Sequence, residues 1–330
     1  MDLIITDKIG REQGFLSCDS VDIENGDEND FEIVIHKENY SKVIHSPDCR
    51  IFSPMEEWGG IIKTIHPSGD LLYLEGPTWR GRLDKSIVEP DAGQDYLVVT
   101  GDANEVIAQI LSRQGLTSLF RAPDTLSGIK VTGYRFPRYY SVLKGFMAML
   151  KSRNGKLSIK YVRGAANEIG YVQIGAEWVR DYSNQVEIGN DMRMDFDIKV
   201  NHMVTNHLIC LGKGDLKDRL VMHLYLDEYG QVSDTQHFFG LDEVTSVYES
   251  SAEEDVDKLK EDGMKKFEEL IQSVSSRATL STDRINVDIG DIVSGRERIT
   301  GMHIRVPVVR KIYALDRTGK ESFEYKLKGE

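Results

Sequence analysis

Apolar residues in the first part of the chain recur at every second position, which is the period of a half-buried β-strand. Phe31, Ile33 and Ile35 alternate with polar neighbours. Further along, apolar residues flank the stretch His66–Asp70, whose proline, serine, glycine and aspartate are typical turn residues. We therefore predict an all-β segment over residues 1–90, with a hairpin over residues 61–74.

The pattern then changes to a helical period. Asp102 and Glu105 have the spacing of a capping box, and Gly115 follows as a candidate C-terminal stop. Between the capping box and Gly115 we predict a helix whose apolar face consists of Val106, Ile107, Ile110 and Leu111. A second helix is predicted from Leu143, Phe146, Met147 and Leu150, ending at Asn154 and Gly155. Alternation over residues 157–161 and 172–176 predicts two strands, so residues 91–182 read as a small α+β domain.

Beyond residue 181 the alternating pattern returns. It predicts strands over residues 195–200, 208–211, 220–226, 303–312 and 323–327, with a turn at Glu228-Tyr229-Gly230. A helix interrupts this β region between residues 250 and 276, with Ser250 and Ser251 as caps and Glu253 and Glu254 three residues on. Its apolar stripe is Val256, Leu259, Gly263, Phe267, Leu270 and Val274. Such a stripe favours packing on the helix's own domain; docking to a partner is the alternative.

Composition limits the class of protein. The chain has 330 residues, a formal net charge of −13 and three cysteines. This length suggests two or three domains, and no apolar run long enough for a transmembrane helix and no secretory signal are visible. Three cysteines without a CxxC pair suit a reducing compartment. The acidic balance argues against tight binding of nucleic acid, because such binding depends on neutralising phosphates.

The sequence Gly212-Lys213-Gly214 invites a phosphate-loop interpretation. A phosphate loop needs GxxxxGK followed by Ser or Thr, with a helix after it. Here Gly214 and Asp215 follow the lysine, and the alternating Leu220, Met222, Leu224 and Leu226 predict a strand. We therefore predict a tight connection between two strands, without a nucleotide.

Other candidate chemistry is sparse. His202 and His207 match no metal-ligand spacing, and no nucleophile motif is visible. Four acidic pairs are expected to be solvated surface or helix caps: Asp27/Glu28, Glu56/Glu57, Asp242/Glu243 and Glu253/Glu254. The basic-aromatic sequence GYRFPRYY at residues 133–140 could stack nucleobases, but its proline and the helix after it favour a packed helix entry. We predict no catalytic, cofactor or metal site.

Eight short motifs are distributed over nearly the whole chain: WRGRL at 79–83, GQDY at 93–96, TGDAN at 100–104, GL at 115–116, LF at 119–120, VTNHLICLGKG at 204–214, HLY at 223–225 and GDIV at 290–293. Together they resemble the siphophage tail-hub family of phages, prophages and phage-derived tail elements. The resemblance implies a baseplate-hub fold, similar to the hub of contractile phage tails and to the base of type VI secretion spikes. Such hubs are trimers in which each subunit carries two tube-like β-barrel domains, so three subunits give a pseudo-sixfold ring between a hexameric tail tube and a threefold tip.

On this basis the fold class is mainly β with α+β. We expect a first β-barrel domain over residues 1–90, the α+β domain over residues 91–182, and a second β-barrel domain over residues 183–330. A peripheral helical insertion at residues 241–284 would interrupt the second barrel. No cell-wall hydrolase or fibre domain is expected after Glu330.

The resemblance also implies partners and a location. The partners are two further copies in a homotrimer, a tail tube or distal tail protein, a tail-tip, spike or fibre protein, and the tape-measure protein. DNA would contact the chain only in transit, past acidic loops such as Glu24–Asp30, and no membrane anchor or cofactor is expected. The protein would be part of a virion tail or phage-derived tail particle, assembled in the bacterial host cytoplasm. A cell-wall hydrolase and a receptor-binding tip protein remain alternatives.

Overall fold

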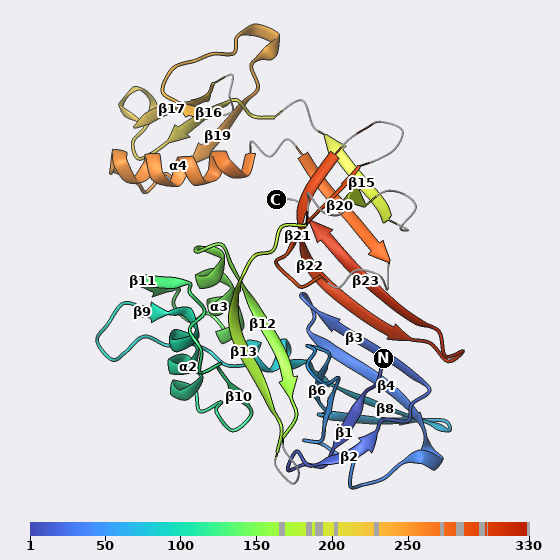
Figure 1. The fold of residues 1–330 in the computed structure, drawn as a ribbon. Coiled ribbons are helices and arrows are strands. Elements are labelled where there is room, and N and C mark those ends of the chain that lie inside the picture. The colour runs from blue at the N-terminus through green and yellow to red at the C-terminus, as the bar shows by residue number, and fades with distance from the viewer. Residues whose placement is uncertain are drawn as a thin grey trace. The chain divides into compact units, whose positions relative to one another are not determined.

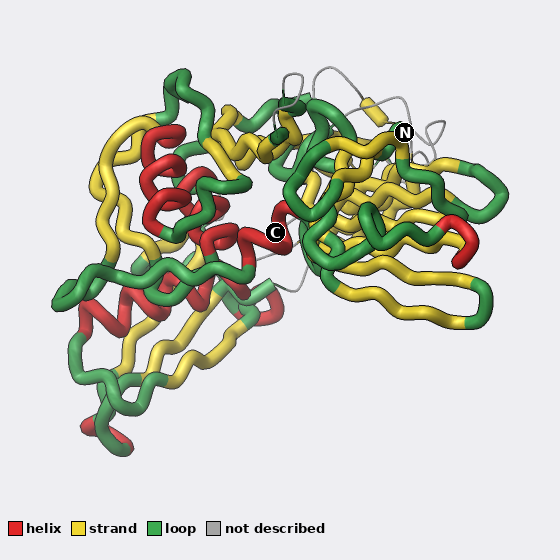
Figure 2. The backbone as a smooth tube through the Cα atoms, turned by 90° about the horizontal axis from the view of Figure 1, so that it is seen from below, coloured by secondary structure: helices red, strands yellow, loops and turns green. Residues whose placement is uncertain are grey.

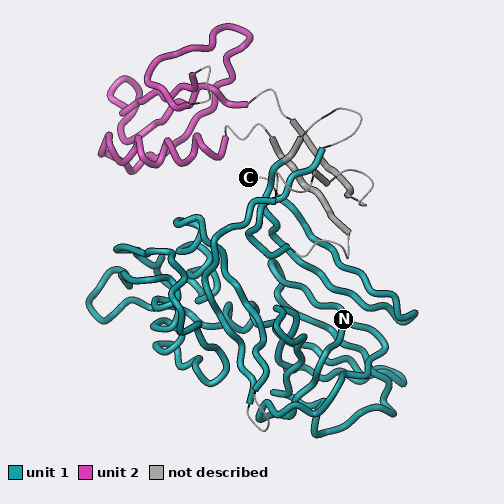
Figure 3. The backbone as a smooth tube through the Cα atoms, in the orientation of Figure 1, with its two compact units in different colours: residues 1–196, 278–328 teal, residues 197–277, 329–330 magenta. Residues whose placement is uncertain are grey.

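The structure is a computed structural model and describes residues 1–164, 169–182, 187–188, 194–200, 204–227, 231–270, 274–281, 287–296, 301 and 303–328. The chain divides into two compact units (Figure 3). Unit 1 combines Met1–Phe196 with Ala278–Lys328, and unit 2 centres on Asp197–Arg277. Among the described helices, none is both long and apolar enough to cross a membrane.

The largest sheet has ten strands and draws them from both ends of the chain (Figure 1). Eight strands form one continuous path in the order β15 (Met194–Val200), β20 (Val274–Ser281), β23 (Glu321–Lys328), β22 (His303–Leu315), β3 (Ser20–Asn25), β4 (Asp30–His36), β8 (Leu71–Pro77) and β7 (Thr64–Ser68). The remaining two are β21 (Ile292–Arg296), which pairs with β22, and β14 (Glu187–Ile188), which pairs with β21.

Strand β22 joins the C-terminal strands to the N-terminal ones. It pairs antiparallel with β23 on one side and with β3 on the other, where Tyr313 lies opposite Ile23 and both are buried. Figure 1 shows the red strands β22 and β23 and the blue strand β3, and in Figure 2 strands are drawn in yellow. The two residue ranges predicted as separate barrels, 1–90 and 183–330, thus contribute strands to one sheet. No sheet among the described strands closes on itself, so the barrels and the domain limits stay predictions.

The predicted hairpin over residues 61–74 is confirmed around its turn, between residues 64 and 74. Strands β7 and β8 are antiparallel, with Ser68 opposite Leu71 and Gly69 at φ +56° between them. That left-handed conformation suits glycine because it has no Cβ. Ile61 belongs instead to β6, in a second sheet.

This second sheet has the order β2 (Glu12–Phe15), β1 (Ile4–Thr6), β5 (Arg50–Phe52) and β6 (Gly59–Ile61). Its apolar face packs on the N-terminal half of the large sheet, and a short 3-10 helix, η1 (Lys37–Asn39), follows β4. The shared core includes Ile5 and Ile51 from the small sheet and Ile23, Ile33 and Leu74 from the large one. The alternating pattern predicts strands here, and the structure arranges them as two packed sheets.

The α+β region begins with the short helix α1 (Trp79–Asp84). Two further helices pack on a three-stranded sheet. The sheet has the order β10 (Phe120–Arg121), β13 (Tyr171–Trp178) and β12 (Gly155–Val162), and β9 (Leu97–Asp102) pairs with β11 (Lys130–Phe136). The helices are α2 (Ala103–Arg113) and α3 (Val142–Lys151). Both helices and the sheet share one core, which contains the predicted apolar positions of α2 and of both strands.

The local signals of α2 and α3 are largely confirmed. Asp102 and Glu105 form the capping box, and Gly115 has φ +65° after the helix. Ser141 caps α3 by accepting a hydrogen bond from the amide of Lys144. Met147, predicted on the apolar face of α3, is instead 39% exposed, and Met149 is buried.

Unit 2 is a four-stranded sheet covered by one helix. The sheet order is β18 (Val232–Ser233), β17 (Val221–Leu226), β16 (His207–Leu211) and β19 (Thr245–Glu249), with β19 parallel to β16. Helix α4 (Val256–Leu270) packs Leu259 and Phe267 against Leu208, Cys210 and Leu224. Two short 3-10 helices, η3 (Leu216–Asp218) and η4 (Gly240–Asp242), lie in its loops.

Several sequence predictions for this region change in the structure. Strands β16 and β17, expected in the second barrel, pair with β19 and belong to unit 2 together with α4. Packing of α4 on its own domain is confirmed, but Val256 is 51% exposed and Val274 lies in β20. The first turn is capped by Asp255, whose carboxylate accepts from the amide of Asp257 at 2.9 Å. The predicted turn at residues 228–230 lies outside the described residues.

Candidate functional site

A strip of carboxylates crosses one face of the ten-stranded sheet. Asp22 on β3 lies opposite Glu32 on β4, and Glu32 lies opposite Glu75 on β8. The residues next to them in each strand, such as Val21 and Ile33, are buried in the core. Since successive side chains of a strand point to opposite faces, the strip stands on the face away from that core. Like charges directly opposite each other destabilise a sheet, so this strip is not explained by folding alone.

The strip lines an open groove of about 830 Å³, to which Glu24 and Asp30 from the predicted acidic loop also contribute. Burial and the negative charges of Glu24 and Asp30 raise the pKa of Asp22. Burial and the charge of Glu24 likewise raise the pKa of Asp30. Seven acidic and three basic side chains line the groove, so its net charge is negative.

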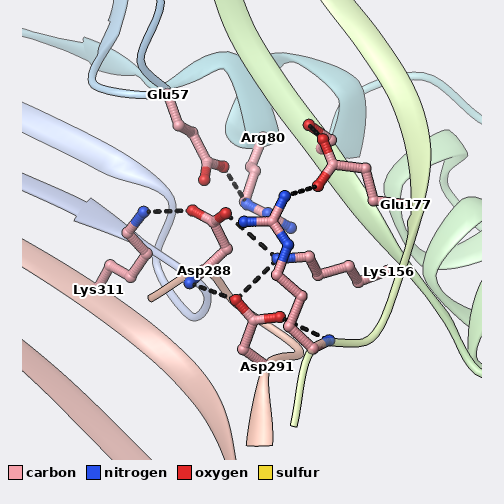
Figure 4. A network of polar contacts seen from close by, with 9 residues as sticks. Glu57, Arg80, Lys156, Glu177, Asp288, Asp291 and Lys311 are labelled. Carbon is pink, nitrogen blue, oxygen red and sulfur yellow. Dashed lines mark hydrogen bonds and ion pairs between the residues drawn. The ribbon is translucent and has the colours of Figure 1, made fainter. Parts of the chain in front are cut away.

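A buried ion network connects three distant segments of unit 1 (Figure 4). The ammonium of Lys156 on β12 lies 2.8 Å from Asp291 Oδ2 and 3.2 Å from Asp288 Oδ2. On the other side, Lys311 of β22 donates to Asp288 Oδ1 at 3.0 Å. Asp291 also accepts from the amides of Arg180 and Asp288, at 3.0 and 2.9 Å. These contacts join the α+β region to the C-terminal strands.

The charges in this network support one another. Burial acts to raise the pKa of Asp288, but the ammonium groups of Lys311 and Lys156 outweigh it and hold the pKa well below the usual aspartate range. For Lys311 burial acts in the opposite sense, and the carboxylates of Glu57 and Asp288 raise its pKa. The buried Lys311 and the partly exposed Asp288 therefore both stay charged, so their pair can hold the two elements together.

The WRGRL motif at residues 79–83 is part of the same polar interior. Trp79 is fully buried, and the buried guanidinium of Arg80 pairs with Glu57. A Cβ on Gly81 would lie 2.1 Å from the carbonyl oxygen of Asn29, so no larger residue fits there without moving backbone. The prediction that the pair Glu56/Glu57 is solvated surface is wrong for Glu57, because Arg80 lies beside it in the interior. The other three acidic pairs are not buried.

The glycine-lysine loop of unit 2 joins β16 to β17, as predicted. Gly214 has φ +110°, and the loop closes through a hydrogen bond from the amide of Leu220 to the carbonyl of Lys213 at 2.9 Å. The amide of Lys213 donates to Glu253, and its ammonium pairs with Glu254. The backbone amide and the ammonium of Lys213 thus both bind protein groups, whereas in a phosphate loop the amides and the lysine bind the phosphates of the ligand.

His207 has partners that sequence reasoning missed, while His202 lies outside the described residues. His207 Nδ1 lies 2.6 Å from Glu243 Oε1, and its Nε2 lies 2.8 Å from His223 Nδ1. The ring also stacks on Tyr225, with the two centroids 4.5 Å apart. Among the described residues, no group of three or more His, Cys, Asp or Glu side chains is arranged to hold a metal.

The GYRFPRYY segment is only in part the packed helix entry that the sequence predicts. Phe136 is buried against the α+β core. Tyr139 and Tyr140, however, are 60% and 43% exposed. Their aromatic surface is therefore available at the outside of the α+β region.

No family model matches the sequence, and no curated protein matches it. Solved structures of similar fold include a tail protein from Neisseria meningitidis, with 13% identity, a TM-score of 0.52 and coverage of 100% of this chain and 97% of that one. The prophage tail protein gp18 from Listeria monocytogenes has 14% identity, a TM-score of 0.53 and coverage of 100% and 95%. The 43 kDa tail protein of prophage MuSo2 from Shewanella oneidensis has 10% identity, a TM-score of 0.56 and coverage of 99% and 98%.

Proposed function

We propose that this chain, which has the fold of phage tail proteins, is the structural hub of a phage tail or phage-derived tail particle. In this role it joins a hexameric tail tube to a threefold tip, forms part of the central channel and catalyses no reaction. The observation that carries the proposal is the eight-stranded path of the large sheet. Strands β3, β4, β8 and β7 come from residues 1–90, and strands β22, β23, β20 and β15 come from residues beyond 183.

A sheet built from two four-stranded halves offers a physical route from threefold to sixfold symmetry. Three copies around one axis supply six halves, so six tube subunits meet six similar surfaces while the tip meets three identical subunits. The path ends at β7 and β15, and end strands present unpaired backbone groups. Pairing of β7 in one copy with β15 in the next would close the ring and leave no free edge.

The carboxylate strip gives this ring a suitable inner surface. Asp22, Glu32 and Glu75 lie in register on the face away from the N-terminal core. If that face lines the channel, its negative potential repels DNA, and DNA passes without binding. This accounts for a row of like charges that costs the isolated sheet stability.

The proposed partners follow from this position. They are two further copies of the chain, a tail tube or distal tail protein, a tail-tip, spike or fibre protein, and the tape-measure protein. The location is the tail of a virion or tail-like particle, assembled in the bacterial host cytoplasm.

Electron microscopy of the assembled particle tests the proposal. We expect three copies between the tube and the tip, with the carboxylate strip facing the channel. Six copies, or a strip facing outward, would contradict the hub. A zymogram on peptidoglycan and a binding assay with host wall glycans test the alternatives. Clearing that is lost on changing one acidic residue would establish a hydrolase, and saturable glycan binding by the isolated chain would favour a receptor-binding protein.

A further inference from the structure

Basic residues are concentrated in one stretch of this acidic chain. Residues 125–167 contain nine Lys and Arg and no Asp or Glu, whereas the chain has 41 basic and 54 acidic residues. The other residues therefore carry 32 basic side chains against all 54 acidic ones. A positive stretch in such a chain creates a local positive potential, which attracts anionic partners.

The stretch forms β11, α3 and β12 in the α+β region. Seven of its basic side chains are exposed. Lys151 and Arg163 have partners, and the other five are Lys130, Arg135, Arg138, Lys144 and Arg153. In the part of the chain that the structure describes, none of these five is paired with a carboxylate. By contrast, Lys156 from the same stretch is buried in the ion network. The positive charge of these five side chains is therefore not neutralised within the described part of the fold.

Apolar and aromatic side chains lie among these charges. Tyr139 is 60% exposed, Tyr140 and Tyr96 are each 43% exposed, and Val98 and Met147 are also exposed. The guanidinium of Arg135 lies 6.0 Å from the ring centroid of Tyr96, and that of Arg138 lies 5.5 Å from the ring centroid of Tyr139. We call the residues Tyr96, Val98, Arg135, Arg138, Tyr139 and Tyr140 the Tyr-Arg face. Tyrosine, methionine and arginine are the residues enriched at protein interfaces.

The backbone of this face is strained at one point. Tyr139 has φ 57°, a left-handed conformation that is uncommon for a residue other than glycine, asparagine or aspartate. Strain of this kind persists where the surrounding structure imposes it, and it clusters at binding sites. Here the amide of Tyr140 donates to Pro137, and the carbonyl of Tyr140 accepts from Val88. The turn is fixed at both sides while the Tyr139 ring remains outside.

We propose that the Tyr-Arg face docks an acidic protein surface, an interaction separate from ring formation by the large sheet. The charge complementarity comes from Arg135 and Arg138, which have no carboxylate partner in the described part of the chain, and the tyrosines supply area that can be buried. A protein surface fits better than nucleic acid. A long polyanion would be repelled by the acidic remainder of the chain, whereas a protein surface contacts this face locally.

Fluorescence anisotropy tests the docking face with defined probes. The probes are a labelled peptide of repeating Glu-Leu-Glu-Glu and a labelled oligothymidine of similar net charge. We expect saturable binding of the peptide by the full chain and weaker binding of the oligothymidine. R135E/R138E should weaken peptide binding at least tenfold. Y139A should weaken it several-fold, although no charge changes.

The matched control is K42E/K217E, which makes the same change in net charge at exposed lysines outside the face. It should bind the peptide within twofold of the unchanged chain, and circular dichroism should show that all variants fold. Equal binding by R135E/R138E and the control would overturn the proposal. So would tighter binding of oligothymidine than of peptide, or binding of neither probe. None of these outcomes bears on the number of copies in the particle.

Discussion

Lys156 and Asp291 form a buried ion pair with 2.8 Å between Nζ and Oδ2, although they are 135 positions apart in the sequence. Each side chain is nearly inaccessible to solvent. The pair fixes β12 of the α+β region to the segment before β21, which belongs to the sheet that carries the proposed ring. We therefore expect the stability of unit 1 to depend on this contact between its α+β region and its large sheet.

Removal of one partner should destabilise unit 1. Lys156→Met leaves Asp291 buried with its two amide donors but without its cation, and breaking a buried pair costs about 3–5 kcal/mol. Urea unfolding followed by tryptophan fluorescence measures this free energy, because all three tryptophans, Trp58, Trp79 and Trp178, lie in unit 1. Lys217→Met, at an exposed site in unit 2, is the control and should change the same transition by less than about 0.5 kcal/mol. Equal effects of the two substitutions would show that the pair does not hold unit 1 together.

The carboxylate strip predicts a pH-dependent gain of stability on neutralisation. The pKa values of Asp22 and Asp30 are raised, so their charged forms destabilise the folded state at neutral pH. D22N/D30N should therefore raise the urea midpoint of unit 1 at pH 7. As the pH falls through the raised values to the ordinary 3.8, the native carboxyls take up protons and the difference should vanish. A difference independent of pH would show that the gain in stability does not come from the charges of these two carboxylates.

Neutralising Asp288 should destabilise the fold at neutral pH, in contrast to neutralising Asp22 and Asp30. Its pKa is depressed below the ordinary 3.8, so its contribution to stability is fully present above that pH and is lost as the pH falls below it. Asp288→Asn should lower the urea midpoint at pH 7, and the deficit should shrink below pH 4. A deficit that persists unchanged in acid would assign the loss to packing instead of charge.

Much of the local structure could be predicted from sequence, because its signals are local. The box of Asp102 and Glu105 fixes the start of α2, and Gly115 with its positive φ follows the end. The pairing of β22 with β3 has no such signal. Tyr313 and Ile23 are 290 positions apart, and an alternating strand does not specify its neighbour.

The functional features were harder to predict for the same reason. Lys156, Asp291 and Lys311 are ordinary charged residues in sequence, and only the fold places them in the interior. Glu57 was expected at the surface because a pair of glutamates usually is, and its partner Arg80 lies in another element. A count of charge by segment would have found the acid-free stretch of residues 125–167, since that signal is present in the sequence.

In the glycine-lysine loop, we expect a substitution of Gly214 to destabilise unit 2 and a substitution of Lys213 to have little effect. Gly214→Val should destabilise unit 2, because φ +110° disfavours a side chain and a Cβ there would lie 2.5 Å from the carbonyl oxygen of Asp218. Lys213→Ala should change stability by less than about 0.5 kcal/mol. Hydrogen exchange of peptides covering β16 and β17 measures both. Titration with ATP and Mg²⁺ gives the competing result: micromolar binding that is lost in Lys213→Ala would establish a nucleotide site.

Helix α4 lies close to its sheet at Gly263. We expect the effect of Gly263→Ala on the stability of unit 2 to depend on the residue at position 210. A Cβ on Gly263 would lie 2.6 Å from Cys210 Sγ, and Cys210 is fully buried. Gly263→Ala gains about 1 kcal/mol of helix propensity, but overpacking costs about 1–3 kcal/mol, so hydrogen exchange in β16 and α4 should become faster. In a Cys210→Ala background the sulfur is absent and the propensity gain remains, so the same Gly263→Ala change should slow exchange. A slowing in both backgrounds would mean that the helix can move away from the sheet, and that this glycine does not set the distance between them.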